Sequence, residues 1–181
     1  MVEKRRILIM AAGTGGHVFP AMAIADRLAS KGVEVHWMGS RGGMEINFLA
    51  DSDYVLHAVT VRGLKGQGIF KAMSAPFMLC KAIYEALKIF SAVKPDCVLG
   101  MGGFISGPGG IVSIFLKKPL VLHEQNAVAG FTNKILAKFA CMVFESFLHT
   151  DIIFDLSNVT FRKINFCYKN RKSILTLERR F

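Results

Sequence analysis

Short, continuous apolar runs alternate with longer amphipathic stretches along most of the chain. The first run, Ile7–Ala12, predicts a buried strand, and after Pro20 apolar residues recur at helical spacing as far as Ala29. Similar runs predict five further strands at Glu34–Met38, Val55–Val61, Cys97–Met101, Leu120–His123 and Cys141–Phe144. Strands that alternate with helices form parallel sheets with right-handed crossovers. We therefore expect an α/β fold, a doubly wound Rossmann-like domain over residues 1–147.

Helical patterns fill the intervals between the predicted strands. Besides the first helix, we expect helices at Met44–Ala50, Ile69–Val93, Ser106–Phe115 and Thr132–Ala140. Pro76 lies inside the longest of these. Because proline removes a backbone donor, we expect an early break in that helix.

The last 34 residues differ in composition from the rest of the chain. Residues 148–181 contain no Gly, Ala or Pro, and they carry seven Lys or Arg against three Asp or Glu. An α/β segment of this length without a turn-forming Gly or Pro is unusual. We expect either a cap or interaction tail, or a tail translated out of frame.

The formal charge of +10 favours an anionic partner, either nucleic acid, a phosphorylated substrate or an anionic membrane surface. No run of five like charges occurs, which argues against a nucleic-acid-binding arm. The four cysteines are widely spaced, so neither a zinc site nor a disulfide framework is expected. No uninterrupted apolar stretch of ~18 residues predicts a spanning helix, and we expect a soluble or peripheral protein.

Two glycine-rich turns follow predicted strands. The first is Gly13-Thr14-Gly15-Gly16, and the second runs from Gly100 to Gly110 and contains Gly102, Gly103, Phe104 and Ser106. Glycines allow a backbone to approach a ligand closely, and the amides at the start of the next helix face an anion. In a doubly wound sheet the first and fourth strands are neighbours, so we expect both turns to line one crevice that suits a diphosphate.

A dinucleotide site is not expected at the first turn. Val18 stands where a GxGxxG motif requires its third glycine. The second strand ends in Met38-Gly39-Ser40, without the acid that holds a ribose hydroxyl. NAD binding is therefore disfavoured.

His17 and the sequence His123-Glu124-Gln125-Asn126 supply the candidate polar groups. A neutral imidazole at the start of the first helix can act as a general base, and the alternative is a histidine that only hydrogen-bonds the loop backbone. The second sequence ends the fifth strand and either binds a polar ligand or braces the neighbouring turn. It is no HExxH zinc motif, because Ala127 occupies the position of the second histidine.

Large apolar residues are interleaved with lysines in two of the predicted helices. The candidates for a membrane-facing patch are Met73, Phe77, Ile83, Ile114 and Phe115. Such stripes form the core in most helices, but apolar residues rimmed by lysines also suit an anionic bilayer surface. Both interpretations remain open at this point.

Four stretches within residues 5–147 closely resemble the MurG family. They are GTGGHVFPAMAIA, the segment Arg62–Gly68, KPDCVLGMGGFISGPGG and PLVLHEQNAVAGFTNKILAKFA. The resemblance implies the N-terminal half of a GT-B glycosyltransferase that needs no metal or other cofactor. It implies transfer of N-acetylglucosamine, with inversion, from UDP-N-acetylglucosamine to undecaprenyl-pyrophosphoryl-N-acetylmuramoyl-pentapeptide in peptidoglycan biosynthesis.

The resemblance also implies roles for individual residues. The glycine-rich turns would hold the acceptor diphosphate, and His17 would be the candidate base. Thr14, Gly15, Gly16 and Asn126 match family positions that contact the donor sugar nucleotide. The apolar, lysine-rimmed patch would dock to the cytoplasmic face of the bacterial inner membrane, with no nucleic acid as a partner.

The resemblance fades after Phe147, before the donor-binding half of the family begins. We therefore expect that the donor-binding domain is absent from this chain. The alternative to an active transferase is a truncated, catalytically inactive remnant that only binds lipid-linked pyrophosphate or membrane.

Overall fold

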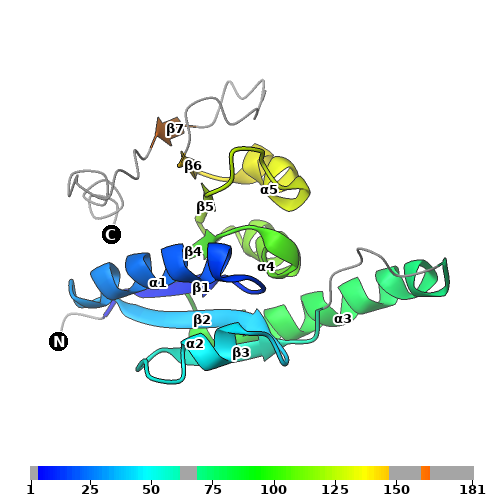
Figure 1. Cartoon of the computed structure of the whole chain (residues 1–181), viewed down its shortest axis with the longest axis horizontal. Coiled ribbons are helices and arrows are strands. Elements are labelled where there is room, and N and C mark those ends of the chain that lie inside the picture. Colours follow the sequence, from blue (N-terminus) through cyan, green and yellow to red (C-terminus); the bar gives the residue numbers. More distant parts are fainter. Residues whose placement is uncertain (1–3, 62–68, 147–159, 164–181) are drawn as a thin grey trace.

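One parallel sheet of seven strands forms the centre of the molecule (Figure 1). The computed structural model describes residues 4–61, 69–146 and 160–163, with the backbone alone for 69–74 and 160–163. The strands are β1 (Arg6–Met10), β2 (Glu34–Ser40), β3 (Val55–Val59), β4 (Cys97–Gly100), β5 (Leu120–Glu124), β6 (Met142–Glu145) and β7 (Thr160–Lys163). Their spatial order is β3-β2-β1-β4-β5-β6-β7, and each neighbouring pair is parallel.

Helices cover both faces of this sheet (Figure 1). One face packs against α1 (Gly15–Ala29) and α2 (Glu45–Phe48). The other packs against α3 (Ile69–Val93), α4 (Gly103–Phe115) and α5 (Phe131–Leu136), which a 3₁₀ turn at Ala137–Phe139 continues. The doubly wound Rossmann-like fold predicted from the sequence is confirmed.

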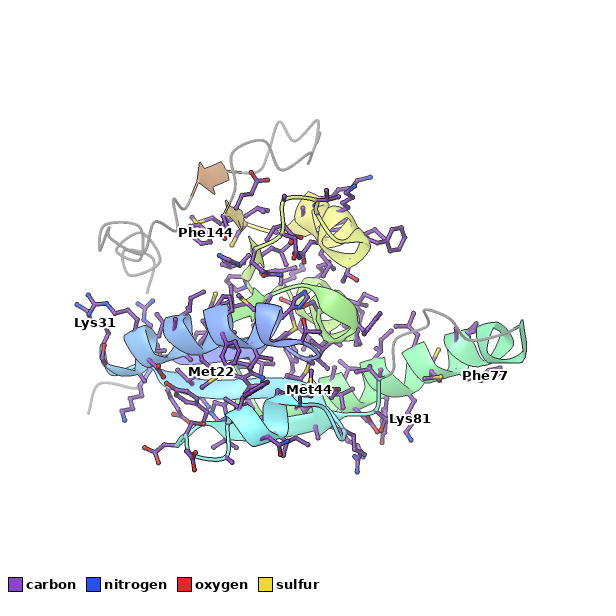
Figure 2. The ribbon with its side chains drawn as sticks, viewed as in Figure 1. Met22, Lys31, Met44, Phe77, Lys81 and Phe144 are labelled. Carbon is purple, nitrogen blue, oxygen red and sulfur yellow. The ribbon has the colours of Figure 1, made fainter. Side chains whose placement is uncertain are left out.

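The continuous apolar run of β1 follows from this burial on both faces. Ile7 and Ile9 pack into the core beneath α1, whereas Leu8 and Met10 pack into the core beneath the opposite helices. Side chains alternate between the faces of a strand, so a central parallel strand needs apolar residues at every position. Phe144 of β6 completes the core on the α1 side (Figure 2).

Two helices begin well before their predicted starts. The helix α1 begins at Gly15, five residues before Pro20, and α4 begins at Gly103 rather than at Ser106. Glycine-rich residues after a strand indicate a turn, but here the same glycines already form the first helical turn. The predicted break at Pro76 is wrong, because α3 continues through it. Proline removes one backbone hydrogen bond, yet α3 is helical on both sides of it, and Ala82, Ala86 and Phe90 of the following turns are buried against the sheet.

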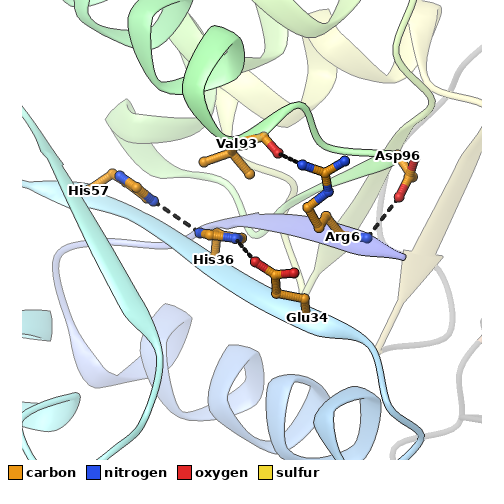
Figure 3. Close-up of polar contacts among 6 residues, drawn as sticks. All are labelled: Arg6, Glu34, His36, His57, Val93 and Asp96. Atoms are coloured by element: carbon orange, nitrogen blue, oxygen red, sulfur yellow. Dashed lines mark hydrogen bonds and ion pairs between the residues drawn. The ribbon is translucent and has the colours of Figure 1, made fainter. Parts of the chain in front are cut away.

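Polar groups join the elements near the amino-terminal ends of the strands (Figure 3). The Arg6 backbone N–H donates to the Asp96 carboxylate at 2.8 Å, and the Arg6 guanidinium donates to the Val93 carbonyl at 2.9 Å. The His36 ring lies 2.8 Å from the Glu34 carboxylate and 3.1 Å from the His57 ring. These groups stabilise the end of the sheet opposite the glycine-rich turns, which follow the carboxyl ends of the strands.

Candidate functional site

The glycine-rich turn after β1 leads directly into α1. Gly13 has a φ of +94°, a conformation that favours glycine, and no heavy atom lies within 4 Å of the position a Cβ would take. The Thr14 carbonyl accepts the His17 N–H at 3.0 Å, but the Thr14 hydroxyl does not cap the helix. The first N–H groups of a helix have no intrahelical acceptor, so this turn presents donors suited to an anion.

A side chain at Gly15 would displace the Phe19 ring. A Cβ at this position would lie 2.6 Å from the Phe19 ring, whereas one at Gly16 would meet only the Thr14 hydroxyl at 3.7 Å. The Phe19 ring also contacts the Phe48 ring, with 4.8 Å between their centroids. Gly13, Thr14 and Gly16 are exposed and Gly15 is partly buried, so most of the first turn is accessible to a ligand.

The turn after β4 is held in shape by Ser106. Gly102 and Gly103 have φ of +90° and +73°, so both positions favour glycine. The Ser106 hydroxyl is fully buried, accepts the Gly102 N–H at 3.1 Å and donates to the Gly102 carbonyl at 2.8 Å. The Met101 N–H donates to the Met10 carbonyl at 3.0 Å and joins this turn to the end of β1. Ser106 therefore braces the turn, and Phe104 is exposed on the first turn of α4.

The two turns meet at His17. A Cβ added to Gly103 would lie 3.9 Å from the Ala12 carbonyl and 4.0 Å from Nε2 of His17. This proximity follows from the adjacency of β1 and β4, which the sequence predicted. The absence of a side chain at Gly103 leaves the space beside His17 Nε2 open.

Burial favours the neutral form of the His17 ring. The half-buried ring has its pKa lowered by desolvation, and the nearby Glu124 carboxylate partly offsets that effect. Its Nδ1 atom is buried and has no hydrogen-bond partner within the described residues. A neutral imidazole carries one N–H. For Nε2 to accept a proton, that hydrogen must be on Nδ1. The geometry gives Nε2 an open approach and keeps the ring neutral near pH 7.

Glu124 at the end of β5 organises the loop that follows it. Its carboxylate is only 1% exposed and accepts four hydrogen bonds. One oxygen accepts the Asn126 N–H at 3.0 Å and the Asn126 side-chain amide at 2.9 Å. The other accepts the Gly130 N–H at 3.0 Å and the Asn133 side-chain amide at 2.9 Å. Of the two interpretations left open by the sequence, this geometry favours bracing of the turn, and direct substrate contact by Glu124 stays a prediction.

His123 and Asn126 lie in different surroundings. His123 is buried, lies 3.4 Å from the Gln125 side-chain oxygen and 3.5 Å from the Ser146 hydroxyl, and has its pKa lowered by burial. Asn126 is exposed, although Glu124 fixes its backbone and side chain. Asn126 is therefore accessible to a ligand, whereas His123 is buried within the fold.

Asn133 is a site residue that the sequence analysis missed. Its side-chain amide donates to Glu124 and, at 3.3 Å, to the His123 carbonyl. A Cβ at Gly102 would lie 3.1 Å from the same amide nitrogen. Asn133 therefore connects the turns that follow β4 and β5. The only signal in the sequence was the position of Asn133 in the helix after the fifth strand, on the side that faces the glycine-rich turn.

Comparisons with known proteins agree with this geometry. Residues 7–145 match the model of the glycosyltransferase family 28 N-terminal domain. The chain belongs to glycosyltransferase family 28. This match spans β1 to β6 and so includes both glycine-rich turns, His17 and Glu124.

Individual relatives narrow the family to MurG. The chain is 51% identical over 144 residues to a UDP-N-acetylglucosamine–N-acetylmuramyl-(pentapeptide) pyrophosphoryl-undecaprenol N-acetylglucosamine transferase of Marinobacter nauticus, covering 80% of this chain and 40% of that protein. A transferase of the same name from Hahella chejuensis is 49% identical over 146 residues, covering 81% and 41%. The recognition of the MurG family from sequence motifs is confirmed. The family 28 chain spans about 40% of the length of these relatives.

Solved structures show the same fold. The crystal structure of MurG from Acinetobacter baumannii is 40% identical, with a TM-score of 0.75, and the match covers 87% of this chain and 45% of that one. A UDP-N-acetylglucosamine 2-epimerase from Rickettsia bellii has a TM-score of 0.62 at 14% identity, covering 89% and 44%. The second likeness shows the fold alone.

The predicted membrane patch divides into exposed and partly buried members. Phe77 and Phe115 are 80% and 77% exposed, whereas Ile83 and Ile114 pack partly against the core beneath α3 and α4. Phe77 lies on the part of α3 that projects beyond the sheet (Figure 2). The side chain of Met73 lies outside the described residues, as does the segment Arg62–Gly68. None of the helices in the described part of the chain is long and apolar enough to cross a membrane.

Proposed function

We propose that this family 28 chain provides the acceptor-binding half of a MurG-type transferase. The reaction moves N-acetylglucosamine from UDP-N-acetylglucosamine to undecaprenyl-pyrophosphoryl-N-acetylmuramoyl-pentapeptide. The observation that carries the proposal is the meeting of two glycine-rich turns at His17, with Nε2 4.0 Å from the vacant Cβ position of Gly103. The 51% identity to a transferase of that name supports the choice of substrates.

The proposed chemistry is a direct displacement. An acceptor hydroxyl attacks the anomeric carbon of N-acetylglucosamine, a new C–O bond forms, and the bond to UDP breaks with its electron pair leaving on the diphosphate. His17 takes the proton of the attacking hydroxyl at Nε2. Because the bond forms on the face opposite the leaving group, the anomeric configuration inverts.

The residues of the two turns receive separate tasks in this proposal. The amides of Thr14, Gly15 and Gly16 and of the α4 N-terminus bind the acceptor diphosphate. Thr14, Gly16 and Asn126 contact the donor sugar, and their exposure to solvent supports this role. Glu124 and Ser106 hold the turns in shape through their buried hydrogen bonds. No metal or cofactor takes part.

We further propose that the chain binds the cytoplasmic face of the bacterial inner membrane as a peripheral protein. The exposed Phe77 and Phe115 side chains support this, because an aromatic ring at the interface removes its apolar area from water. The exposed lysines Lys81 and Lys117 lie on α3 and just after α4, and they would contact anionic headgroups.

A second candidate function is binding without turnover. The two proposed anion-binding turns beside His17 can hold a lipid-linked diphosphate by themselves. The chain covers 40% of the length of the Marinobacter relative, so the whole reaction is proposed only for a protein that also binds the donor.

Transfer of labelled N-acetylglucosamine from its UDP donor to a short-chain lipid acceptor distinguishes these candidates. Purified chain 1–181 is assayed beside a full-length relative, each with and without His17→Ala or its equivalent. Transfer by chain 1–181 that His17→Ala abolishes supports the transferase. Binding of the acceptor without transfer supports the second candidate, and absence of both contradicts the proposal.

A further inference from the structure

Glu45 is a buried carboxylate that the proposed mechanism does not use. It is the first residue of α2, and its side chain is 0% exposed. Carboxylates are seldom fully buried unless their oxygens are satisfied. One oxygen accepts the Ser40 hydroxyl at 2.7 Å and also the Ser40 N–H, and the other accepts the Gly13 N–H at 3.2 Å. Glu45 therefore connects the end of β2 to the first glycine-rich turn.

The segment between β2 and α2 is shaped around this carboxylate. A Cβ at Gly43 would lie 2.3 Å from both Glu45 oxygens and from the Ser40 hydroxyl. A Cβ at Gly39 would lie 2.9 Å from the Glu45 side chain. Neither glycine has a positive φ, so the two positions lack side chains because the carboxylate occupies that space. The space is filled by the Glu45 side chain, and the donors around it match a carboxylate.

The bond to Gly13 fixes the direction of the turn. Gly13 is where the chain leaves β1 with a φ of +94°, and its N–H points toward Glu45. With that N–H held by a buried acceptor, the amides that follow, from Thr14 to Gly16, are available for a ligand. The negative charge of Glu45 opposes binding of an anion at the same turn. Electrostatic attraction therefore cannot explain why a glutamate occupies this position.

We propose that Glu45 is a positioning residue that holds the Gly13–Gly16 turn in the shape that binds a diphosphate. The proposal rests on the proposed function for the identity of the ligand. Under this proposal, Glu45→Gln has two opposing effects on the affinity for an anion. Loss of the charge alone strengthens anion binding, whereas loss of the acceptor for Gly13 weakens it, since a glutamine cannot accept all three hydrogen bonds without presenting a donor to one of them.

The test combines ligand binding with a measurement on the ligand-free chain. Farnesyl diphosphate and inorganic pyrophosphate are titrated into chain 1–181 as wild type, Glu45→Gln and Gly43→Ala. Amide resonances of Gly13–Gly16 are recorded by ¹⁵N NMR without ligand. The variant Gly43→Ala keeps the charge but forces the carboxylate away from Gly13. Tyr54→Phe, which removes a hydrogen bond to Asp26 away from the turn, is the control for a general loss of stability.

We expect Glu45→Gln and Gly43→Ala each to weaken binding of farnesyl diphosphate by ~tenfold, the effect of one lost hydrogen bond to a charged group. Both variants shift the Gly13–Gly16 resonances, and Tyr54→Phe changes neither property. Unchanged or tighter binding by Glu45→Gln overturns the proposal, and so do unshifted resonances. If wild type binds neither probe, the proposed function fails, and the resonances alone decide whether Glu45 positions the turn.

Discussion

Replacing Glu124 by glutamine keeps the size of a buried side chain and changes its hydrogen-bonding capacity. The carboxylate accepts four hydrogen bonds, two at each oxygen. A glutamine oxygen can still accept the two from Asn126. Its amide nitrogen then faces two donors, the Gly130 N–H and the Asn133 amide, where an acceptor is required.

The size of the effect follows from what each donor can do instead. Asn133 has a side-chain oxygen without a partner within the described residues, so rotation of its amide converts one donor–donor contact into a hydrogen bond. That rotation gives up the 3.3 Å bond to the His123 carbonyl. The Gly130 N–H has no such escape, and a buried unsatisfied donor costs about 1–3 kcal/mol. With the weakening of the remaining bonds, we expect Glu124→Gln to lower the free energy of unfolding by about 3 kcal/mol.

Thermal and urea unfolding of chain 1–181 measure this change. A loss of about 3 kcal/mol lowers Tm by roughly 6–12 °C for a chain of this length. Glu85→Gln is the matched control, because its carboxylate also accepts from a backbone N–H, that of Thr60, but its second donor is the Thr60 hydroxyl. A hydroxyl can turn and accept from the new amide, so the control loses less than about 1 kcal/mol.

A second replacement checks the assignment of the contacts. Asn133→Asp places a carboxylate beside Glu124 and is expected to destabilise the chain, whereas Glu124→Gln combined with Asn133→Asp restores a donor–acceptor pair. The double variant should therefore be more stable than the sum of the single effects predicts. A free energy of unfolding for Glu124→Gln within about 0.5 kcal/mol of wild type, the range of a neutral surface substitution, would contradict this role of the Glu124 hydrogen bonds.

Four further predictions concern the site and the surface. Replacing the His17 equivalent by alanine in a full-length relative lowers kcat by roughly 10²–10⁴-fold with little change in the KM for UDP-N-acetylglucosamine, and an unchanged kcat would remove the base role. Burial lowers the pKa of His57 below its ordinary 6.5, so the unfolded chain binds more protons and stability falls as the pH falls below 6.5. His57→Gln should lose less stability between pH 7 and pH 5 than wild type, as urea titrations at each pH would show. Gly103→Ala places a methyl group near His17 at a positive φ and costs about 1–2 kcal/mol of stability in thermal unfolding. Phe77→Ser weakens sedimentation with anionic vesicles by ~tenfold, whereas Ile46→Ser on the opposite face leaves it unchanged; equal effects would contradict a specific membrane face.

The sequence allowed the sheet to be predicted closely because a central parallel strand leaves few alternatives. The six predicted strands, including Ile7–Ala12, overlap the observed β1 to β6, and the adjacency of β1 and β4 is confirmed. Helix starts were less accurate. Glycine favours turns and helix ends, so the pattern placed the start of α4 at Ser106 although the chain becomes helical at Gly103.

The candidate site was predicted where backbone conformation left a mark in the sequence. Positive φ at Gly102 and Gly103 requires glycine, so the turn is visible as a motif. The positioning residues Glu45 and Asn133 left no such mark, because their partners are backbone N–H groups and side chains distant in sequence. The strand β7 was also missed, and most of residues 148–181, together with the predicted domain boundary at Phe147, lie outside the described residues.

In the proposed function, the two glycine-rich turns together form a diphosphate site beside His17. The most direct test is the affinity of chain 1–181 for a polyprenyl diphosphate relative to the matching polyprenyl monophosphate, measured for wild type and Gly103→Ala in detergent. We expect wild type to bind the diphosphate at least ~tenfold more tightly than the monophosphate, and Gly103→Ala to lose that preference. Equal affinity of wild type for the two lipids would contradict it.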